Sequence, residues 1–330
     1  MTATRAIASF ELAIELNTQS YGPEHESVGE NHHALGIQLV ATGRFDEARV
    51  QLDTALTILR SAVGERHPSA AAVEADVAEV CMRTGDFACA DRSYVKALAV
   101  FEEIDGPSSD MALTVLAATA TLRQHQGRAD EALALFELAY ARAMTRADLP
   151  GWELGKVAGN LAVARGTQQD WAGALEYAVV SRDAFVASLG ADVPLVVNAE
   201  TLLGTIQREL GQLDASAASL ARAVELAHRV MAPTGPDRIN AEIELGHTAL
   251  ALGHRDRALA LAENVVAVMT DAARSPSGGE AHFLIARALG SKSERGRAAA
   301  RRAAEIYGGL RPGYEAQAQL ATAWLEAPTQ

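Results

Sequence analysis

Small side chains recur along this chain at a fixed interval, with larger apolar residues between them. Glycine stands at positions 43, 85, 127, 211 and 253, which follow one another at intervals of 42 residues with one position left out. The position left out is 169, where the chain has Gln169. Two further columns of small residues keep the same phase: Ala6, Ala48, Ala90, Ala132, Ala174, Ser216, Ala258 and Ala300, and Gly36, Ala78, Ala120, Ala162, Gly204, Gly246 and Ala288. Because antiparallel helices approach closely only where side chains are small, this pattern predicts a series of helical hairpins.

The apolar residues keep helical spacing throughout, and good helix formers dominate, so we expect an all-α chain. We expect one continuous domain over residues 1–330, because each hairpin can bury its apolar face on its neighbours. The predicted parts are a half repeat at 1–19, six full repeats within 25–273, a degenerate repeat at 277–308 and a capping helix at 312–326. Arg287 takes the place of a packing leucine in the degenerate repeat.

The individual hairpins can be placed from the same columns. We expect the six full ones at 25–61, 68–104, 108–146, 150–189, 192–231 and 235–273. The turn Gly64 to Pro68 lies between two of them and is echoed by Gly22 to His25. Since His25 and His67 repeat with the period, we expect both to have a structural role.

The order of small and aromatic residues in each unit resembles the tetratricopeptide repeat. Leu35, Gly36, Gly43, Phe45 and Ala48 carry the resemblance in the first full unit. The longer, 42-residue unit with its histidine-containing turn is similar to the kinesin light chain type of this family, which also occurs in bacterial proteins. The resemblance implies a right-handed α-solenoid of about seven hairpins, whose first helices line a concave groove that binds a protein or peptide.

Composition narrows the classes of function. The net charge is −13, which does not suit binding to nucleic acid, whose phosphates dominate affinity. The segment 287–311 is basic; it could contact an acidic partner or form the solvated face of a terminal helix. The most apolar later run, 258–273, contains Glu263 and Asp271, so we expect no membrane span.

Cysteine usage bears on the compartment. The chain has two cysteines, Cys81 and Cys89, which flank one hairpin turn. Two cysteines in 330 residues suggest a reducing compartment without a disulfide framework. Cys89 replaces glutamates of neighbouring repeats, so we expect it on an outer face. These observations predict a cytoplasmic protein.

No motif for catalysis, phosphate binding or a cofactor is present. Histidines 25, 32 and 33 cluster in the sequence, but adjacent helix residues point about 100° apart, so His32 and His33 are poorly placed to share a metal ion. We therefore expect no metal site, no cofactor and no enzymatic activity.

The resemblance also indicates which residues point into the groove. The column six residues before the small residue of each first helix reads Glu30, Ala72, Thr114, Lys156, Asn198, Asn240 and His282. Asparagine can both donate to and accept from a peptide backbone, and lysine attracts carboxylates. Asn160 matches the asparagine of a signature in kinesin light chain repeats, and Arg83, His125 and Arg208 are expected lower on the same wall. The alternative is a groove that is only hydrated.

Two functions follow as hypotheses. The first is a scaffold that binds a protein or peptide in the groove through Lys156, Asn160, Asn198 and Asn240. The second is a regulatory or sensory segment of a larger bacterial signalling protein, for example one following a serine/threonine kinase domain. Self-association through the unpaired helix at 3–19 is compatible with both.

Overall fold

The computed structural model describes residues 3–269, 271–310 and 313–326, which form sixteen α-helices, one short 3-10 helix and no strand. This confirms the all-α prediction. The helices are α1 (Ala3–Tyr21), α2 (Glu26–Ala41), α3 (Phe45–Val63), α4 (Pro68–Arg83), α5 (Phe87–Ile104), α6 (Asp110–His125), α7 (Ala129–Ala143), α8 (Gly151–Thr167), α9 (Trp171–Leu189), α10 (Pro194–Glu209), α11 (Leu213–Val230), α12 (Pro236–Ala251), α13 (Arg255–Val268), η1 (Ala272–Arg274), α14 (Pro276–Leu289), α15 (Glu294–Gly309) and α16 (Glu315–Glu326).

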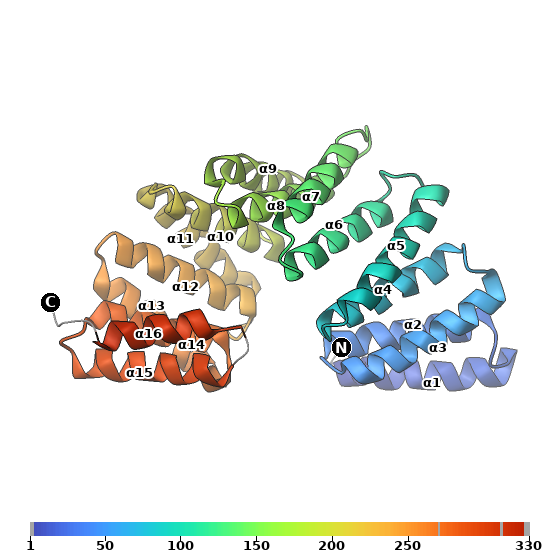
Figure 1. Cartoon of the computed structure of the whole chain (residues 1–330), viewed down its shortest axis with the longest axis horizontal. Coiled ribbons are helices and arrows are strands. Elements are labelled where there is room, and N and C mark those ends of the chain that lie inside the picture. The colour runs from blue at the N-terminus through green and yellow to red at the C-terminus, as the bar shows by residue number, and fades with distance from the viewer. Residues whose placement is uncertain (1–2, 270, 311–312, 327–330) are drawn as a thin grey trace. The chain divides into compact units, whose positions relative to one another are not determined.

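The helices group into two compact units, residues 1–149 and residues 150–330. Within each unit, helices adjacent in sequence pack as antiparallel pairs, as Figure 1 shows. The first helices of successive pairs also contact one another: α2 contacts α4 and α4 contacts α6 in the first unit, and α8, α10, α12 and α14 follow in the second. This is the arrangement of a helical-repeat solenoid in each unit. One continuous domain over 1–330 stays a prediction.

The small residues lie where paired helices approach most closely. A Cβ atom added to Gly36 would lie 2.6 Å from Leu52 Cδ2, and one added to Gly204 would lie 2.5 Å from Leu220 Cγ. The alanine column behaves in the same way: Ala48, Ala90, Ala132, Ala174, Ala258 and Ala300 have no exposed surface. Each pair therefore depends on a large residue of one helix filling the space beside a small residue of the other.

The last hairpin has a shorter register than the sequence pattern predicts. Gly279 approaches the ring of Tyr307, as Gly155 approaches the ring of Phe185. Gly279 follows Gly155 by 124 residues, two fewer than three intervals of 42. Ile285, which is buried, therefore takes the packing position. The expectation that Arg287 occupies it is wrong: Arg287 is exposed, because the connection around η1 shortens the repeat by two residues.

The histidines of the turns cap the helices that follow them. The side chains of His25 and His67 accept hydrogen bonds from the backbone N–H groups of Ser27 and Ser69, both at 3.2 Å. An N-cap side chain satisfies one of the donors that a helix leaves free at its start. The predicted structural role of these two histidines is confirmed.

The two cysteines differ from expectation. Cys81 and Cys89 form a disulfide, with their Cα atoms 5.8 Å apart, and Cys89 is buried instead of lying on an outer face. The antiparallel pairing of α4 and α5 brings residues on the two sides of their turn within bonding range. The guanidinium of Arg49 also donates to both sulfur atoms. The expectation that the chain has no disulfide framework is wrong, and a cytoplasmic location stays a prediction that this pair does not support.

We predict opposite effects for two glycine-to-alanine changes in the second unit. Gly204→Ala forces a methyl group against Leu220 and should lower the free energy of unfolding by about 1–2 kcal/mol net of its gain in helix propensity. Gly308→Ala, in a helix with no heavy atom within 4 Å of the added Cβ, should raise it by about 0.5–1 kcal/mol. Urea unfolding followed by tryptophan fluorescence measures both effects, because Trp152, Trp171 and Trp324 all lie in this unit. A stabilising Gly204→Ala would contradict the packing described above.

Candidate functional site

One face of the first helices in the second unit carries a band of mostly polar residues. We call the following set the inner stripe: Lys156, Asn160 and Val163 of α8, Asn198, Leu202 and Thr205 of α10, Asn240, Glu244 and His247 of α12, and Glu280 and Arg287 of α14. Contacts between neighbouring helices show that these residues share a face. Asn198 donates to Asp237 of α12 at 3.3 Å, Thr205 donates to Glu244 at 3.2 Å, and His247 lies 2.9 Å from Glu280.

His282, the last member of the predicted column, is not on this stripe. It lines a different hollow, with Val266, Ala299 and Arg302, and is half-buried there. Burial lowers the pKa of His282, and the nearby Arg302 guanidinium lowers it further. The register shift in α14 explains the difference, since Glu280 follows Asn240 by 40 residues and takes the expected position of His282.

Three of the predicted residues line one pocket of about 290 Å³ between α8 and α10, which we call the α8–α10 pocket. Lys156 and Asn160 come from α8, and Asn198 comes from α10. The rest of the lining is Gly155, Gly159, Val163, Ser181, Phe185, Leu195, Ala199 and Leu202. Its walls are thus mostly apolar, with a cation and two amides at the surface.

The glycines of α8 let the helices that form this pocket pack closely. A Cβ on Gly155 would meet the Phe185 ring at 2.8 Å, and one on Gly159 would meet Ser181 Oγ at 3.0 Å. Ser181 itself donates to the Gly155 carbonyl at 2.7 Å across the helix pair. The glycines therefore have a packing reason, and they also keep side chains away from the floor of the pocket.

Two polar groups of this pocket have no polar partner in the described part of the chain. The ammonium of Lys156 lies 5.3 Å from the centroid of the Trp152 ring, a cation–π contact, and forms no ion pair with a described residue. Asn160 is half-buried, and its amide makes no hydrogen bond to any residue that the structure describes. Asn198 makes only the long contact to Asp237. These groups are available to a ligand.

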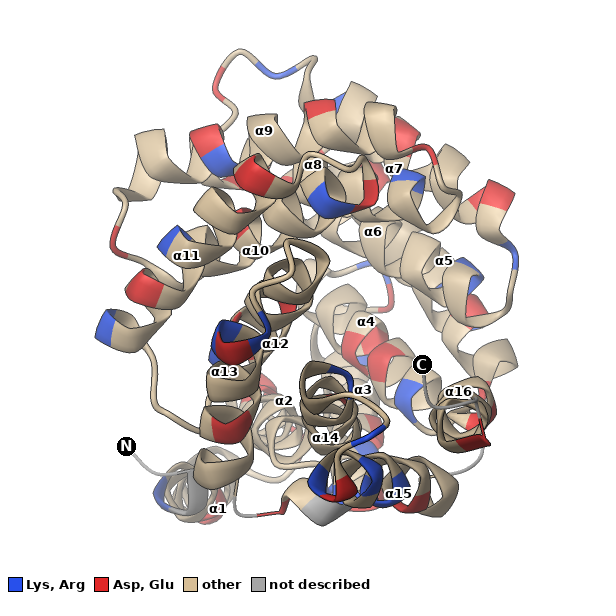
Figure 2. Cartoon of the chain, turned by 90° about the vertical axis from the view of Figure 1, so that its left-hand side faces the viewer, with Lys and Arg blue, Asp and Glu red and all other residues tan. Residues whose placement is uncertain are grey.

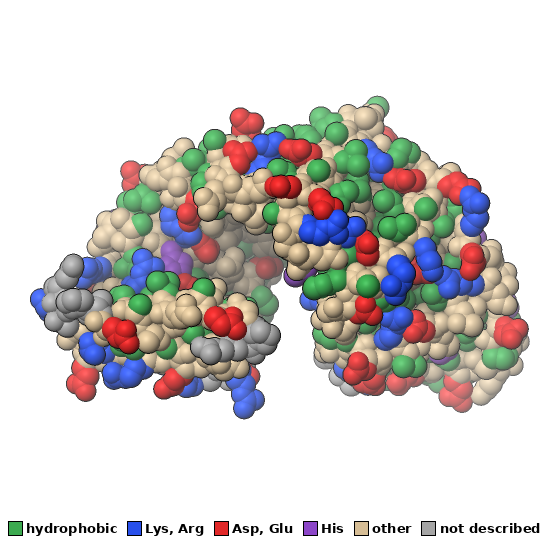
Figure 3. All heavy atoms as spheres, in the orientation of Figure 1, with side chains coloured by type: hydrophobic (Ala, Val, Ile, Leu, Met, Phe, Trp, Pro, Cys, Tyr) green, Lys and Arg blue, Asp and Glu red, His purple; other side chains and the backbone are tan. Residues whose placement is uncertain are grey.

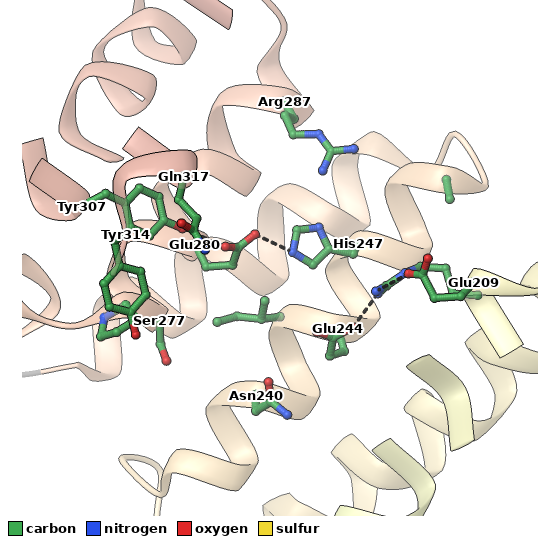
Figure 4. A pocket seen from close by; sticks show the side chains of 14 residues that line it. Glu209, Asn240, Glu244, His247, Ser277, Glu280, Arg287, Tyr307, Tyr314 and Gln317 are labelled. Atoms are coloured by element: carbon green, nitrogen blue, oxygen red, sulfur yellow. Dashed lines mark hydrogen bonds and ion pairs between the residues drawn. The ribbon is translucent and has the colours of Figure 1, made fainter. Parts of the chain in front are cut away.

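Asn240 and Arg208 line a second and larger pocket, of about 610 Å³. The predicted groove residues of the second unit are therefore divided between two pockets. We call it the α12–α14 pocket; Figure 4 shows it from close by. Arg208 is already engaged there, since its guanidinium lies 2.5 Å from Glu244 and 3.2 Å from Glu209. Asn240 is exposed, and no described residue bonds to its side chain.

The α12–α14 pocket contains a cluster of titratable groups that the sequence analysis did not identify. His247 Nε2 lies 2.9 Å from one oxygen of Glu280, and the Tyr307 hydroxyl donates to the other at 2.7 Å. Burial raises the pKa of Glu280, but the hydrogen bonds from His247 and Tyr307, together with the nearby charges of His247 and Arg287, outweigh it and hold the pKa below its ordinary value. Burial raises the pKa of Tyr307, and the nearby Glu280 carboxylate raises it further. Counting in steps of 42 could not reveal this cluster, because the shortened repeat moves Glu280 into it.

Arg83 and His125, also predicted as groove residues, belong to the first unit. Arg83 forms an ion pair with Glu79 at 2.7 Å, one turn earlier on α4. Glu79 in turn accepts a hydrogen bond from Tyr94 at 3.3 Å. His125 is exposed at the end of α6 and makes no hydrogen bond or ion pair with a side chain among the described residues. Arg83 is therefore occupied, whereas His125 is free.

The other features considered in the sequence analysis are the adjacent histidines, a metal site and a membrane span. His32 bonds to Gln51 at 2.7 Å and His33 to Asp76 at 2.5 Å, so the two histidines point to different partners. Within residues 3–269, 271–310 and 313–326, no group of three His, Cys, Asp or Glu side chains could hold a metal ion. None of the described helices combines the length and apolarity that crossing a membrane requires. Figure 3 shows acidic and basic side chains scattered among hydrophobic ones on the visible face.

The lowered pKa of Glu280 predicts a pH dependence of stability. A carboxyl group whose folded-state pKa is depressed stabilises the fold above its ordinary pKa, and this contribution disappears as the pH falls below it. The difference in unfolding free energy between the wild type and Glu280→Gln should therefore shrink between about pH 5 and about pH 3. Urea unfolding monitored by tryptophan fluorescence across this range measures the difference. The control is Glu176→Gln, which removes an exposed carboxylate without a described partner and should give a difference nearly independent of pH. Equal pH profiles for the two variants would contradict the assignment.

The comparisons with known proteins agree with this architecture. Residues 3–61 and 69–145 match the sequence profile of the tetratricopeptide repeat. No curated protein matches the chain. A structure from Podosopora anserina, described as kinesin light chain nearly identical TPR-like repeats, has a TM-score of 0.52 at 21% identity and covers 63% of this chain and 99% of its own.

Two further solved structures show the same fold over more of the chain. The APC/C hetero-tetramer Cut9-Hcn1 gives a TM-score of 0.63 at 16% identity, over 86% of this chain and 46% of that one. A Rap protein complexed with Competence and Sporulation Factor gives 0.58 at 14% identity, over 97% and 84%. At these identities the likeness is one of fold alone. The first unit thus matches the tetratricopeptide repeat in sequence, and the second unit has the same arrangement of helical hairpins.

Proposed function

Because a tetratricopeptide-repeat fold suits protein interaction, we propose that this chain is a scaffold that binds an extended segment of a protein partner across the α8–α10 pocket. The observation that carries the proposal is the unpartnered polar set of that pocket, Lys156 and Asn160, next to Asn198 and above apolar walls. An extended peptide presents backbone N–H and C=O groups that pair with amide side chains.

The pocket offers both apolar side chains and polar groups, and recognition of a peptide requires both. Val163, Leu195 and Leu202 are all partly or largely exposed within it and offer apolar contact to a side chain of the partner. Asn160 and Asn198 can fix the backbone, while Lys156 favours a partner with a nearby carboxylate. Leu195 is 38% exposed and Val163 45% exposed, so binding would remove apolar surface from water.

The structural relatives support the general role without naming a partner. One was solved as a complex with Competence and Sporulation Factor and another as the hetero-tetramer Cut9-Hcn1. Proteins of this fold therefore occur in complexes. The identity of the partner has to come from the site itself.

A regulatory or sensory role within a larger bacterial signalling protein is the second candidate. The chain shares its fold with a Rap protein that was solved in complex with Competence and Sporulation Factor. An antibody against the chain provides the test: a native product well above 34.8 kDa on a denaturing gel supports the candidate, and a product of that size contradicts it.

Self-association through α1 would add to the scaffold role. Leu12 and Leu16, one turn apart on α1, are 55% and 52% exposed and form an apolar strip. Sedimentation of the chain at high concentration tests this idea, and a purely monomeric profile would contradict it.

We predict that peptides bound by the chain depend on the α8–α10 pocket. Peptides would be selected from a random display library on the purified full chain, and their affinity measured by fluorescence anisotropy. The double variant Lys156→Ala/Asn160→Ala removes one cation and one amide and should weaken binding at least about tenfold, with no change in the unfolding midpoint.

The matched control is Lys292→Ala, which removes an exposed lysine outside the pocket and should leave the affinity unchanged. Gly159→Ala is a second check. Its added methyl group meets only the side chain of Ser181, with Oγ at 3.0 Å, so this variant should lower the affinity less than the double variant does. Equal affinities for the wild type and the double variant would refute the site.

A further inference from the structure

The Cys81–Cys89 disulfide of the first unit is a feature that the peptide-binding proposal does not use. It joins the last turn of α4 to the first turn of α5, on either side of the exposed turn at residues 83–86. Cys81 is 1% exposed and Cys89 is 7% exposed. The charges around the two sulfur atoms decide whether such a bond is inert or takes part in exchange with other thiols.

The guanidinium of Arg49, on α3, points at this bond. Its Nη1 donates to Cys81 Sγ at 2.8 Å and to Cys89 Sγ at 3.3 Å, while its Nε donates to Asp53 at 2.8 Å. A sulfur atom in a disulfide is uncharged and accepts hydrogen bonds weakly, whereas a thiolate forms a charge-assisted hydrogen bond with a guanidinium. Arg49 therefore stabilises a reduced pair that carries a thiolate more than it stabilises the disulfide.

The next repeat shows what these three positions hold elsewhere. The residues 42 positions after Arg49 and the two cysteines are Asp91, Arg123 and Glu131. Arg123 lies 2.6 Å from Asp91 and 3.9 Å from Glu131. That repeat thus places opposite charges in contact where this one places Arg49 beside two sulfur atoms. A thiolate beside Arg49 would give the cysteine site the same pairing of opposite charges.

The α4–α5 pair is packed independently of the bond. Ala78 and Ala90, its members of the two small-residue columns, have no exposed surface, and Tyr94 is 2% exposed. The two cysteines are only eight residues apart in sequence, so the bond restricts the unfolded chain less than a cross-link over a long loop does. We therefore expect reduction to leave the helices in place and to change only the contacts of the two sulfur atoms.

We propose that Cys81 and Cys89 form a reversible redox site, which a dithiol reduces in the folded chain and whose reduced form Arg49 stabilises. A thiolate of the dithiol attacks one sulfur atom of the pair and forms a mixed disulfide, and the other protein sulfur leaves as a thiolate beside Arg49. The second thiol of the reductant then closes its own disulfide and releases the first protein sulfur.

Two electrons pass from the dithiol to the protein pair in this exchange. The dithiol loses two protons, of which one stays on a protein thiol and the other goes to solvent. The site lies in the first unit, and its chemistry does not depend on the α8–α10 pocket.

The first experiment asks whether the folded chain undergoes this exchange. The full chain is incubated with dithiothreitol in the absence of denaturant, and the released thiols are counted with a thiol-specific dye. We expect both cysteines to be released while the helical circular dichroism spectrum stays unchanged. A bond that dithiothreitol reduces only after unfolding in urea would be purely structural, and this result would overturn the proposal.

The second experiment measures the part that Arg49 plays. The wild type and Arg49→Gln are equilibrated in buffers of reduced and oxidised glutathione, quenched with acid and alkylated, and the fraction reduced is read from the mass. Half reduction of Arg49→Gln should need a ratio of squared reduced to oxidised glutathione about five- to tenfold higher than the wild type. Arg49→Lys keeps the positive charge and should restore most of the difference.

The control separates Arg49 from the general charge of the first unit. Figure 2 shows both acidic and basic residues along α4 and α5, so several charges act near the site. Arg5→Gln removes the same charge from an exposed position on α1, which packs against α2, and should leave the glutathione ratio unchanged. An unchanged ratio in Arg49→Gln, or an equal shift in Arg5→Gln, would overturn the proposal. Each variant is first required to show the helical circular dichroism of the wild type.

Discussion

The close approach of paired helices at small residues is the constraint on which the rest of the structure depends. Gly36 against Leu52 and Gly204 against Leu220 show that one face of each first helix has to lie against its partner. Once that face is buried, the opposite side of the helix does not pack against the partner helix of the pair. In the second unit this free side carries the inner stripe. The polar residues there are therefore determined by bonds between neighbouring first helices, by binding chemistry or by solvent, and not by the packing of each pair.

The sequence was sufficient to predict much of this. The 42-residue columns identified the all-α class, the helix pairs and the role of the turn histidines, because packing repeats whenever the period repeats. The resemblance to the tetratricopeptide repeat also pointed to Lys156, Asn160 and Asn198, which the structure brings into one pocket. These three residues lie on two neighbouring helices where the period is unbroken, so that equal spacing in sequence means equal place in the fold.

The parts that could not be predicted have physical causes. Two residues are lost near η1, and this shift exchanges His282 for Glu280 on the inner stripe and moves Arg287 to a pocket rim. Positions 42 residues apart are equivalent only while the period continues, and a single short connection is enough to break it. The Cys81–Cys89 disulfide could not be predicted from the number of cysteines. The bond depends on the positions of the two cysteines on facing helices, which bring their side chains within bonding range.

The two pockets of the second unit differ in how far their polar groups are already satisfied. In the α12–α14 pocket most charged groups are bonded to one another; Arg287 makes no hydrogen bond or ion pair with a described residue, but its charge lowers the pKa of Glu280. In the α8–α10 pocket the amide of Asn160 has no internal partner. A partner that binds there completes hydrogen bonds that the folded chain leaves open, and this is the central claim of the account.

Hydrogen–deuterium exchange of the full chain with and without a saturating selected peptide tests that claim most directly. Binding across the α8–α10 pocket should slow exchange in α8 and α10, while α9 and α11, which form the second helices of these pairs, should change little. Protection confined to α9 and α11, or spread equally over all four helices, would contradict it.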